Sequence, residues 1–99
     1  MIAFSYSRAD EADICGTSYH NVNVYGNIDK MIEKFGPPGR GDGYKTKHEW
    51  IFRGPTPDEN VAVYDYKYNG AHNGEWHVGA TSFKNAKQFE KWFNSVMST

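Results

Sequence analysis

The stretch VAVYDYKY, which begins at Val61, constrains the fold more than any other part of the chain. Val61 and Val63 stand at odd positions of this run, and Tyr64, Tyr66 and Tyr68 stand at even positions. Because successive side chains of a β-strand point to opposite faces of the sheet, this alternation predicts a strand with one aliphatic face and one aromatic face. The chain is therefore expected to build a sheet whose two faces differ in chemistry.

Two more strands and two helices are predicted around this stretch. HEWIFR (48–53) and EWHVGAT (75–81) are typical of strands, and the turn-rich segments GPTPDEN and NGAHNG separate them from 61–68. Apolar residues recur at helical spacing over 28–35 and 83–97. The pattern predicts a single α+β domain over residues 1–99. It is an antiparallel meander sheet of three to four strands with two helices packed on one face, the additional strand coming from the N-terminal quarter.

The helix ends carry local signals. Asn27 is a candidate N-cap for the first helix, and Gly36 followed by Pro37 and Pro38 ends it. Thr81 or Ser82 is expected to cap the second helix. The residues of the second helix that we expect to be buried are Ala86, Phe89, Trp92, Phe93 and Val96.

Simple connecting loops would fix which residues meet across the sheet. They would place Trp50 opposite Tyr64, His48 and His77 opposite Tyr66, and Gly79 opposite Tyr64. One face would then carry His48, Trp50, Phe52, Tyr64, Tyr66, Tyr68, Glu75 and His77. The other face would carry Ile51, Val61, Val63, Trp76, Val78 and Ala80, a set suited to the helices. Asp65 and Lys67 are expected near an edge or a water-exposed end.

The aromatic face has three interpretations. Its rings either cover the sheet beneath loops or the first 25 residues, or form a homo-oligomer interface, or bind a ligand or macromolecule. Tyrosine suits all three, since its ring is apolar and its hydroxyl forms hydrogen bonds. We expect a homo-oligomer, most simply a dimer, that uses Trp50, Tyr64 and Tyr66.

The composition limits the possible partners. The net charge is −1, so bulk electrostatics does not attract long nucleic acid or an anionic membrane. No apolar run approaches the roughly 20 residues that cross a bilayer. Cys15 is the only cysteine, which fits a reducing compartment, and the first 13 residues lack the pattern of a signal peptide. We therefore expect a cytoplasmic protein.

Residues 36–47, GPPGRGDGYKTK, form a candidate phosphate-binding loop, because glycines let backbone N–H groups approach an anion and basic side chains add charge. The loop is not a P-loop, since no Gly-Lys-Ser/Thr follows at the needed spacing. The alternative is a turn-rich connector. The candidate ligand-binding residues, with the sheet rings, are Arg40, Tyr44, Lys45, Lys47, Trp50, Tyr64, Tyr66, Trp76 and His77. A small nucleotide, held by one stacking ring and one phosphate anchor, fits this set better than a long strand does.

The four histidines show no metal-ligand spacing, so neither a metal nor a cofactor is expected. Two pairs are candidates for acid–base catalysis: His77 with Glu75, and His48 with Asp65. No nucleophile motif accompanies them, and Cys15 has no obvious basic neighbour that would lower its pKa. A small hydrolase that uses one of these pairs is therefore the alternative to a binding protein.

Most of the chain resembles a family of small uncharacterised bacteriophage proteins. The matching residues are Gly16, Thr17, Phe35, Gly36, Pro37, Asp42, Gly43, Tyr44, Lys45, Glu49, Trp50, Val61, Ala62, Tyr64, Lys67, Trp76, His77 and Gly79. Ala80 stands where the pattern has a second glycine. The resemblance implies a protein made in the cytoplasm of an infected cell. It further implies a non-enzymatic inhibitor of a host defence, which sequesters a nucleotide-like signal or docks on a host protein.

Overall fold

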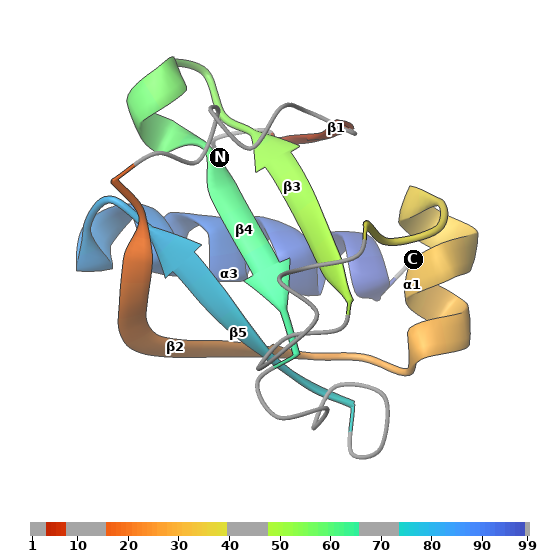
Figure 1. Ribbon diagram of the computed structural model, residues 1–99. Coiled ribbons are helices and arrows are strands. Elements are labelled where there is room, and N and C mark those ends of the chain that lie inside the picture. Colours follow the sequence, from red (N-terminus) through yellow and green to blue (C-terminus); the bar gives the residue numbers. More distant parts are fainter. Residues whose placement is uncertain (1–3, 8–15, 40–47, 66–73, 99) are drawn as a thin grey trace.

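The chain folds into one sheet and two helices (Figure 1), and its computed structural model describes residues 4–7, 16–39, 48–65 and 74–98. In chain order the elements are β1 (Ser5–Ser7), β2 (Ser18–Tyr25), α1 (Ile28–Phe35), β3 (Glu49–Arg53), the 3-10 helix η2 (Pro57–Glu59), β4 (Val61–Tyr64), β5 (Glu75–Ala80) and α3 (Phe83–Met97). The predicted α+β fold is confirmed.

The sheet is antiparallel and has five strands in the order β1-β3-β4-β5-β2. The strands β3, β4 and β5 follow one another in the chain and pair in that order, which confirms the predicted meander. The N-terminal quarter supplies both outer strands, β1 beside β3 and β2 beside β5. Figure 1 shows α3 crossing one face of the sheet, with α1 beyond β3. The other face of the sheet has no described helix on it.

Both helices have the predicted bounds because their end signals are local. The Asn27 side chain accepts a backbone N–H of the first turn of α1 at 2.7 Å. Gly36 ends α1 by donating its N–H to the Ile32 carbonyl at 2.8 Å, with φ at 90°, a left-handed value that favours glycine. Ser82 caps α3, because its Oγ accepts the Asn85 N–H at 3.1 Å.

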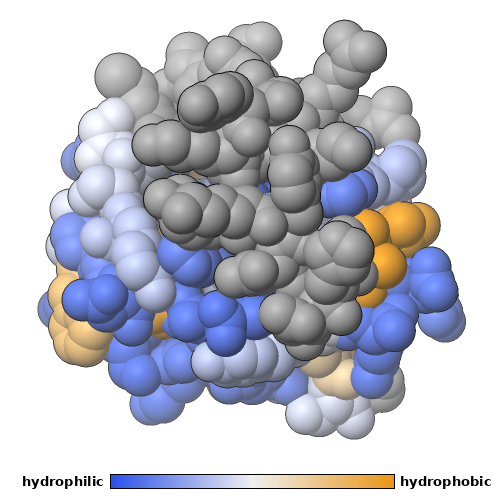
Figure 2. Space-filling model, turned by 60° about the horizontal axis from the view of Figure 1, so that its bottom comes forward, coloured by the Kyte–Doolittle hydropathy of each residue, from blue (hydrophilic) through white to orange (hydrophobic). Residues whose placement is uncertain are grey.

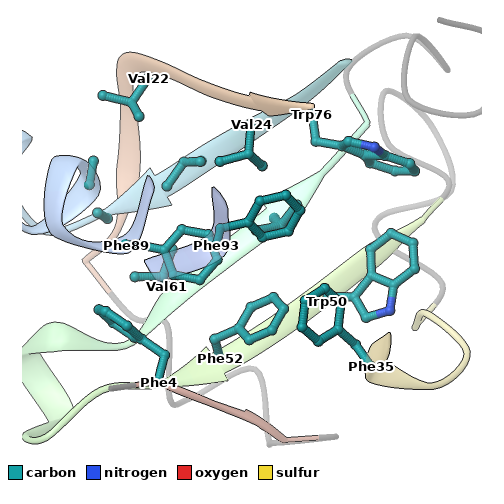
Figure 3. Close-up of a cluster of buried hydrophobic side chains, with 14 of the residues drawn as sticks. Phe4, Val22, Val24, Phe35, Trp50, Phe52, Val61, Trp76, Phe89 and Phe93 are labelled. Atoms are coloured by element: carbon teal, nitrogen blue, oxygen red, sulfur yellow. The ribbon is translucent and has the colours of Figure 1, made fainter. Parts of the chain in front are cut away.

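Large apolar side chains gather between the helices and one sheet face. Most of the described residues visible on the surface in Figure 2 are hydrophilic, whereas Figure 3 shows the buried rings packed together. Phe52, Phe89 and Phe93 have no exposed surface, and Phe4 meets Phe89 edge-on with ring centroids 5.2 Å apart. Each such burial stabilises the fold by about 1.5–3 kcal/mol, so this layer dominates the stability.

Two buried tryptophans hold α1 against the sheet. The Trp50 indole donates its Nε1–H to the Gly36 carbonyl at 2.9 Å, and the Trp76 indole donates to the Gly26 carbonyl at 2.9 Å. The two indoles meet edge-on, with ring centroids 5.0 Å apart and 83° between their planes. Because Gly26 precedes the helix cap and Gly36 follows the last helical residue, the tryptophans fix both ends of α1.

The pairing of β3 with β4 corrects the predicted register by one residue. Trp50 lies opposite Val63 rather than Tyr64, and Ile51 lies opposite Ala62. A shift of one residue moves every side chain of a strand to the other face. Trp50 and Phe52 therefore face the helices with no exposed surface, and their predicted place on the aromatic face is wrong.

The turn between β3 and β4 sets this register. Asn60 is buried, and its Oδ1 accepts the Gly54 N–H at 3.0 Å across this turn. Phe52 lies opposite Val61, where a simple seven-residue loop would put Arg53. In the observed register Trp50 packs against Trp76 and Phe52 against Phe89, and neither Trp50 nor Phe52 has exposed surface. Ile51 lies on the opposite face and is itself only 7% exposed.

The pairing of β4 with β5 differs from the prediction by two residues. Tyr64 lies opposite His77 rather than Gly79. The connection between β4 and β5 spans 65–74, longer than the six-residue loop assumed, but an even shift keeps each side chain on its predicted face. Tyr64 and His77 thus share the face that α3 does not cover. The pairings predicted for Tyr66 and Tyr68 lie outside the described residues.

Candidate functional site

Three side chains surround His77 on the sheet face that carries no described helix, which we call the open face, and Tyr19, Asn23, Tyr64 and His77 together are the His77 cluster. Ile51 and Ala62 lie on the same face and are buried, so this face is covered around them. The Tyr19 ring stacks on His77 with centroids 4.0 Å apart and 13° between the planes. Tyr64 approaches His77 from the neighbouring strand at 5.7 Å and 59°. The Tyr19 hydroxyl donates to Asn23 Oδ1 at 2.7 Å. Three strands, β2, β4 and β5, therefore meet in one group of rings.

An irregularity in β2 brings Tyr19 onto this face. Asn23 pairs with His77 and Tyr19 pairs with Gly79, so β2 carries extra residues between these two pairs. Asn21, within this segment, has φ at 61°, and Figure 1 shows β2 turning a sharp corner. Because the excess is even, Tyr19 and Asn23 keep the same side of the sheet. Their role was missed from the sequence, although Val22 and Val24 alternate with polar residues that must face away from the core.

Gly79 leaves room for Tyr64. A Cβ built at position 79 would lie 3.3 Å from Tyr64 Cε1, 3.7 Å from Thr17 Oγ1 and 3.8 Å from the Ala62 Cβ. The phenol ring of Tyr64 therefore lies close over the backbone of β5. A glycine in a strand interior often marks such a close approach.

Two members of the cluster, His77 and Tyr64, have pKa values shifted toward the neutral form. Burial lowers the pKa of His77, and the carboxylate of Glu75 opposes this shift without cancelling it. Burial raises the pKa of the Tyr64 hydroxyl, and the neighbouring Tyr19 and Glu49 add to the rise. His77 is thus a neutral imidazole and Tyr64 a neutral phenol. The cluster offers flat, polarisable rings to a ligand rather than a positive charge.

The predicted pair of His48 and Asp65 is confirmed as a contact. Asp65 has no exposed surface, and its two oxygens lie 2.8 Å from the backbone N and 2.8 Å from the ring Nδ1 of His48. A carboxylate accepts hydrogen bonds, so Nδ1 of His48 carries the hydrogen that it donates to Asp65. Nε2 is the ring nitrogen that takes no part in this hydrogen bond. The expectation that Asp65 lies at a water-exposed end is wrong, because its hydrogen bonds to His48 satisfy it inside the protein.

The pair of His48 and Asp65 lies on the core side of the sheet. The His48 ring meets the Trp76 indole edge-on at 6.4 Å, so His48 does not join Tyr64 as predicted. Within the described ranges, no serine, threonine or cysteine is hydrogen-bonded to His48. The other predicted pair, Glu75 and His77, shares one strand and one face, and its coupling is the charge effect on the pKa of His77.

The remaining predicted ligand-binding residues divide into two groups. Trp50 and Trp76 are fully buried in the core and fasten α1, so their rings are not on the open face. The second group lies outside the described residues and consists of Arg40, Tyr44, Lys45, Lys47 and Tyr66.

The described residues contain no group of three or more histidine, cysteine, aspartate or glutamate side chains able to hold a metal ion. None of the helices in the described part of the chain has the length and hydropathy needed to cross a membrane. Comparisons of the chain with protein-family models, with curated proteins and with solved structures found no match.

Proposed function

We propose that this chain is a small, non-enzymatic binding protein that holds a planar, nucleotide-like ligand on the open face of its sheet. The observation that carries the proposal is the parallel stack of Tyr19 on His77, at 4.0 Å and 13°, by a tyrosine that is still 37% exposed. His77 covers one side of the phenol ring. The exposed part of Tyr19 is then available to a second ring.

The stack is organised before any ligand arrives. The Tyr19 ring lies against His77, and its hydroxyl is held by Asn23 at 2.7 Å. A ring that is already fixed loses little conformational entropy on binding. Stacking a base on an aromatic side chain contributes about 1–3 kcal/mol, which supports weak binding by itself and tight binding with one further anchor.

The charge complement of a phosphate is predicted to come from the 36–47 loop. The carboxylates Glu49 and Glu75 border the neutral His77 cluster and disfavour an anion there. We propose that Arg40, Lys45 and Lys47 supply the anchor. Binding would then weaken with added salt, since exposed charges are screened over about 8–10 Å near physiological ionic strength. Salt-independent binding would argue against these three residues.

The biological role follows from the resemblance to phage proteins. We propose that ligand retention sequesters a nucleotide-like signal of a host defence in the infected cell. Docking on a host defence protein through the same face is the other route to inhibition. The support for both is the resemblance, together with an open face that carries exposed rings.

The test is equilibrium dialysis of the protein against AMP and UMP. Tyr19→Ala removes the stacking ring and is expected to weaken binding about 5-fold to 150-fold, given about 1–3 kcal/mol for one stacked base. Tyr19→Phe keeps the ring and is expected to bind nearly as wild type. The matched control is Tyr25→Ala, which removes a 61% exposed ring from the same strand. Equal loss in the Tyr19→Ala and Tyr25→Ala variants, or no loss in either, would contradict the proposal.

A second candidate function is hydrolysis assisted by His48. The observation that favours it is the fully buried carboxylate of Asp65, which orients the ring through Nδ1 at 2.8 Å. In that role Nε2 would take a proton from an attacking water. Turnover of 4-nitrophenyl acetate or bis(4-nitrophenyl) phosphate that His48→Gln abolishes and His77→Gln retains would support a hydrolase. A wild-type protein that turns over neither substrate would rule it out for these two ester classes.

A further inference from the structure

Two acidic residues stand beside the His77 cluster on the open face of the sheet. Glu75 lies two residues before His77 in β5, so both side chains point to this face. Glu49 of β3 lies opposite Tyr64 of β4, which in turn lies opposite His77, so these three residues form one row across the sheet. Neighbouring strands are about 4.8 Å apart and alternate residues of a strand are about 7 Å apart, so both acidic residues lie within about 10 Å of His77 along the sheet.

The negative charge of these carboxylates reaches the rings of the cluster. Glu75 raises the pKa of His77 against the larger effect of burial, and Glu49 adds to the rise in the pKa of Tyr64. Among the described residues, no lysine or arginine is a cause of either shift. Arg53, a cation on the same face of β3, stands four residues from Glu49, about 13 Å along the strand. The described charges nearest the rings are therefore negative.

We propose that the flat ligand of the His77 cluster is an aromatic cation, a ring with a positive charge of its own, as an N-alkylated pyridine or an N-alkylated nucleobase has. The inference rests on the proposed stacking of a ligand on Tyr19 and adds the charge of the stacked ring. The face of an aromatic ring is electronegative, so a cation placed over it is attracted. Tyr19, which is 37% exposed, supplies that face. The carboxylates of Glu49 and Glu75 add an attraction that is screened over about 8–10 Å.

The rings of the cluster do not oppose such a cation. Burial disfavours the charged form of His77, so the imidazole stacked on Tyr19 adds no positive charge. A neutral flat ring would gain the stacking alone, and a compact cation would gain the charge attraction alone. A flat cation gains both. A phosphate on the same ligand would still be held by the basic residues proposed for the 36–47 loop.

The test is an NMR titration of the full chain at neutral pH, with the ring signals of Tyr19 and His77 as reporters. The probe is 1-methylnicotinamide, a flat cation, and its matched control is nicotinamide, the same ring without the charge. A third probe, tetramethylammonium, carries the charge without a flat ring. We expect 1-methylnicotinamide to bind about fivefold or more tightly than either control, from the cation over the ring and two nearby carboxylates.

A second pair of probes distinguishes the two sources of an aromatic cation. 1-Methyladenosine carries the positive charge on a nucleobase, and adenosine is its neutral counterpart. Tighter binding of 1-methyladenosine than of 1-methylnicotinamide would assign the site to an alkylated nucleobase, and the reverse order would assign it to a pyridinium ring. Both orders support an aromatic cation, provided that each cation binds more tightly than its neutral counterpart.

Three results would overturn the proposal. Equal binding of each cation and its neutral counterpart would mean that the charge is not recognised, and the proposed stacking function would stand. Equal binding of tetramethylammonium and 1-methylnicotinamide would mean that the flat ring is not recognised. If no probe shifts the reporters, the aromatic-cation site is absent, and the dialysis against AMP and UMP then decides separately whether the proposed function also fails.

Variants separate the charge from the stacked ring. Glu75→Gln keeps the size of the side chain and is expected to weaken binding of 1-methylnicotinamide about twofold to fivefold while leaving nicotinamide unchanged. Adding Glu49→Gln is expected to remove most of the remaining preference for the cation. Tyr19→Ala is expected to weaken both probes.

Glu90→Gln is the matched control for the loss of one negative charge. Glu90 lies in α3, which crosses the other face of the sheet, and it pairs with Lys87 (Figure 1). This variant is expected to bind 1-methylnicotinamide as wild type does. An equal loss in Glu75→Gln and Glu90→Gln, or an unchanged preference for the cation when both Glu49 and Glu75 are replaced, would also overturn the proposal.

Discussion

At the scale of single residues, His77 is the group whose surroundings determine its chemistry. It lies between Tyr19 and Tyr64, and its pKa is lowered by burial, with Glu75 opposing the change. The same burial that keeps the imidazole neutral also holds it flat against Tyr19. Neutrality and stacking are therefore two consequences of one packing arrangement.

The lowered pKa of His77 predicts how stability depends on pH. The unfolded chain binds this proton more readily than the folded protein does, since the ordinary pKa is 6.5 and the folded value is lower. The contribution of His77 is full above the unfolded pKa and is lost as the pH falls toward the folded pKa. We expect the free energy of unfolding to fall more steeply in wild type than in His77→Gln as the pH drops below the ordinary pKa of 6.5, measured by urea denaturation.

An NMR titration supplies the control for this prediction. Glu75→Gln removes the charge that raises the pKa of His77, so the pKa is expected to fall further. Tyr19→Ala removes the stacked ring that shields the imidazole, so the pKa is expected to rise toward its ordinary value. Shifts in the opposite directions would refute this account of His77.

Gly79 is predicted to be required by packing rather than by backbone conformation. Gly79→Ala would place a Cβ 3.3 Å from Tyr64 Cε1, a distance at which the ring must give way. We expect a loss of about 1–3 kcal/mol in the free energy of unfolding and a displaced Tyr64 ring. The same change in a Tyr64→Ala background is the control, because the ring that the new Cβ would meet is then absent and the remaining neighbours lie 3.7 and 3.8 Å away, so its effect is expected within about 0.5 kcal/mol. Similar losses in the two backgrounds, in chemical denaturation, would contradict the packing account.

At the scale of elements, α1 depends on the two tryptophans for its position. It has only eight residues, too few to be stable alone in water. Its two ends are bound through the carbonyls of Gly26 and Gly36 to buried indoles of β5 and β3. The helix is thus held by tertiary contacts at its two ends, where its own hydrogen bonds begin and end.

Trp76→Phe is expected to loosen the start of α1. The change leaves the half-buried Gly26 carbonyl without the indole N–H and costs about 1–3 kcal/mol, besides the lost ring volume. Amide hydrogen exchange in the first turn of α1 should speed up more than exchange in α3. Trp92→Phe, at a half-buried position of α3, is the control for lost ring volume: Trp92 meets Phe35 at the far end of α1, with ring centroids 6.1 Å apart, so the amides of the first turn of α1 should stay protected. Unchanged α1 protection in Trp76→Phe would show that the indole contact does not hold the helix.

At the scale of the whole molecule, the predicted homo-oligomer stays a prediction, but the structure changes the residues that could form it. Trp50 is buried in the core and cannot contact a second copy. Tyr19 and Tyr25, which lie 37% and 61% exposed on β2, provide apolar surface at the open face instead. A twofold contact would bury this patch on both partners.

Sedimentation of wild type over a range of concentrations tests the dimer. Tyr25→Ser is expected to shift the protein toward monomer without lowering Tm, because the residue is mostly outside the core. Phe83→Ser is the control, since Phe83 is 57% exposed at the start of α3 and belongs to no strand. A wild-type protein that stays monomeric at every concentration would remove the open face as a self-association surface.

Much of the fold could be predicted because its signals are local. Asn27, Gly36 and Ser82 sit at helix ends and satisfy backbone groups within a few residues, so both helix ranges follow from the sequence. Alternation over short segments likewise determined the meander and the helix-facing valines. The pairing of His48 with Asp65 was foreseen as a contact, although its burial was not.

The tertiary structure alone decided the register and therefore the site. HEWIFR has apolar residues on both of its faces, and only packing with the rest of the molecule puts Trp50 and Phe52 on the helix face and Ile51, which is also buried, on the other face. The tertiary structure also decided the contact between Tyr19 and His77, which depends on the irregular pairing of β2 with β5. Register depends on the summed burial of residues far apart in the chain, and the alternation within one strand carries no information about that sum. For this reason the sequence by itself determined the helices and strands, and packing between them determined which aromatic rings lie on the face that carries no described helix.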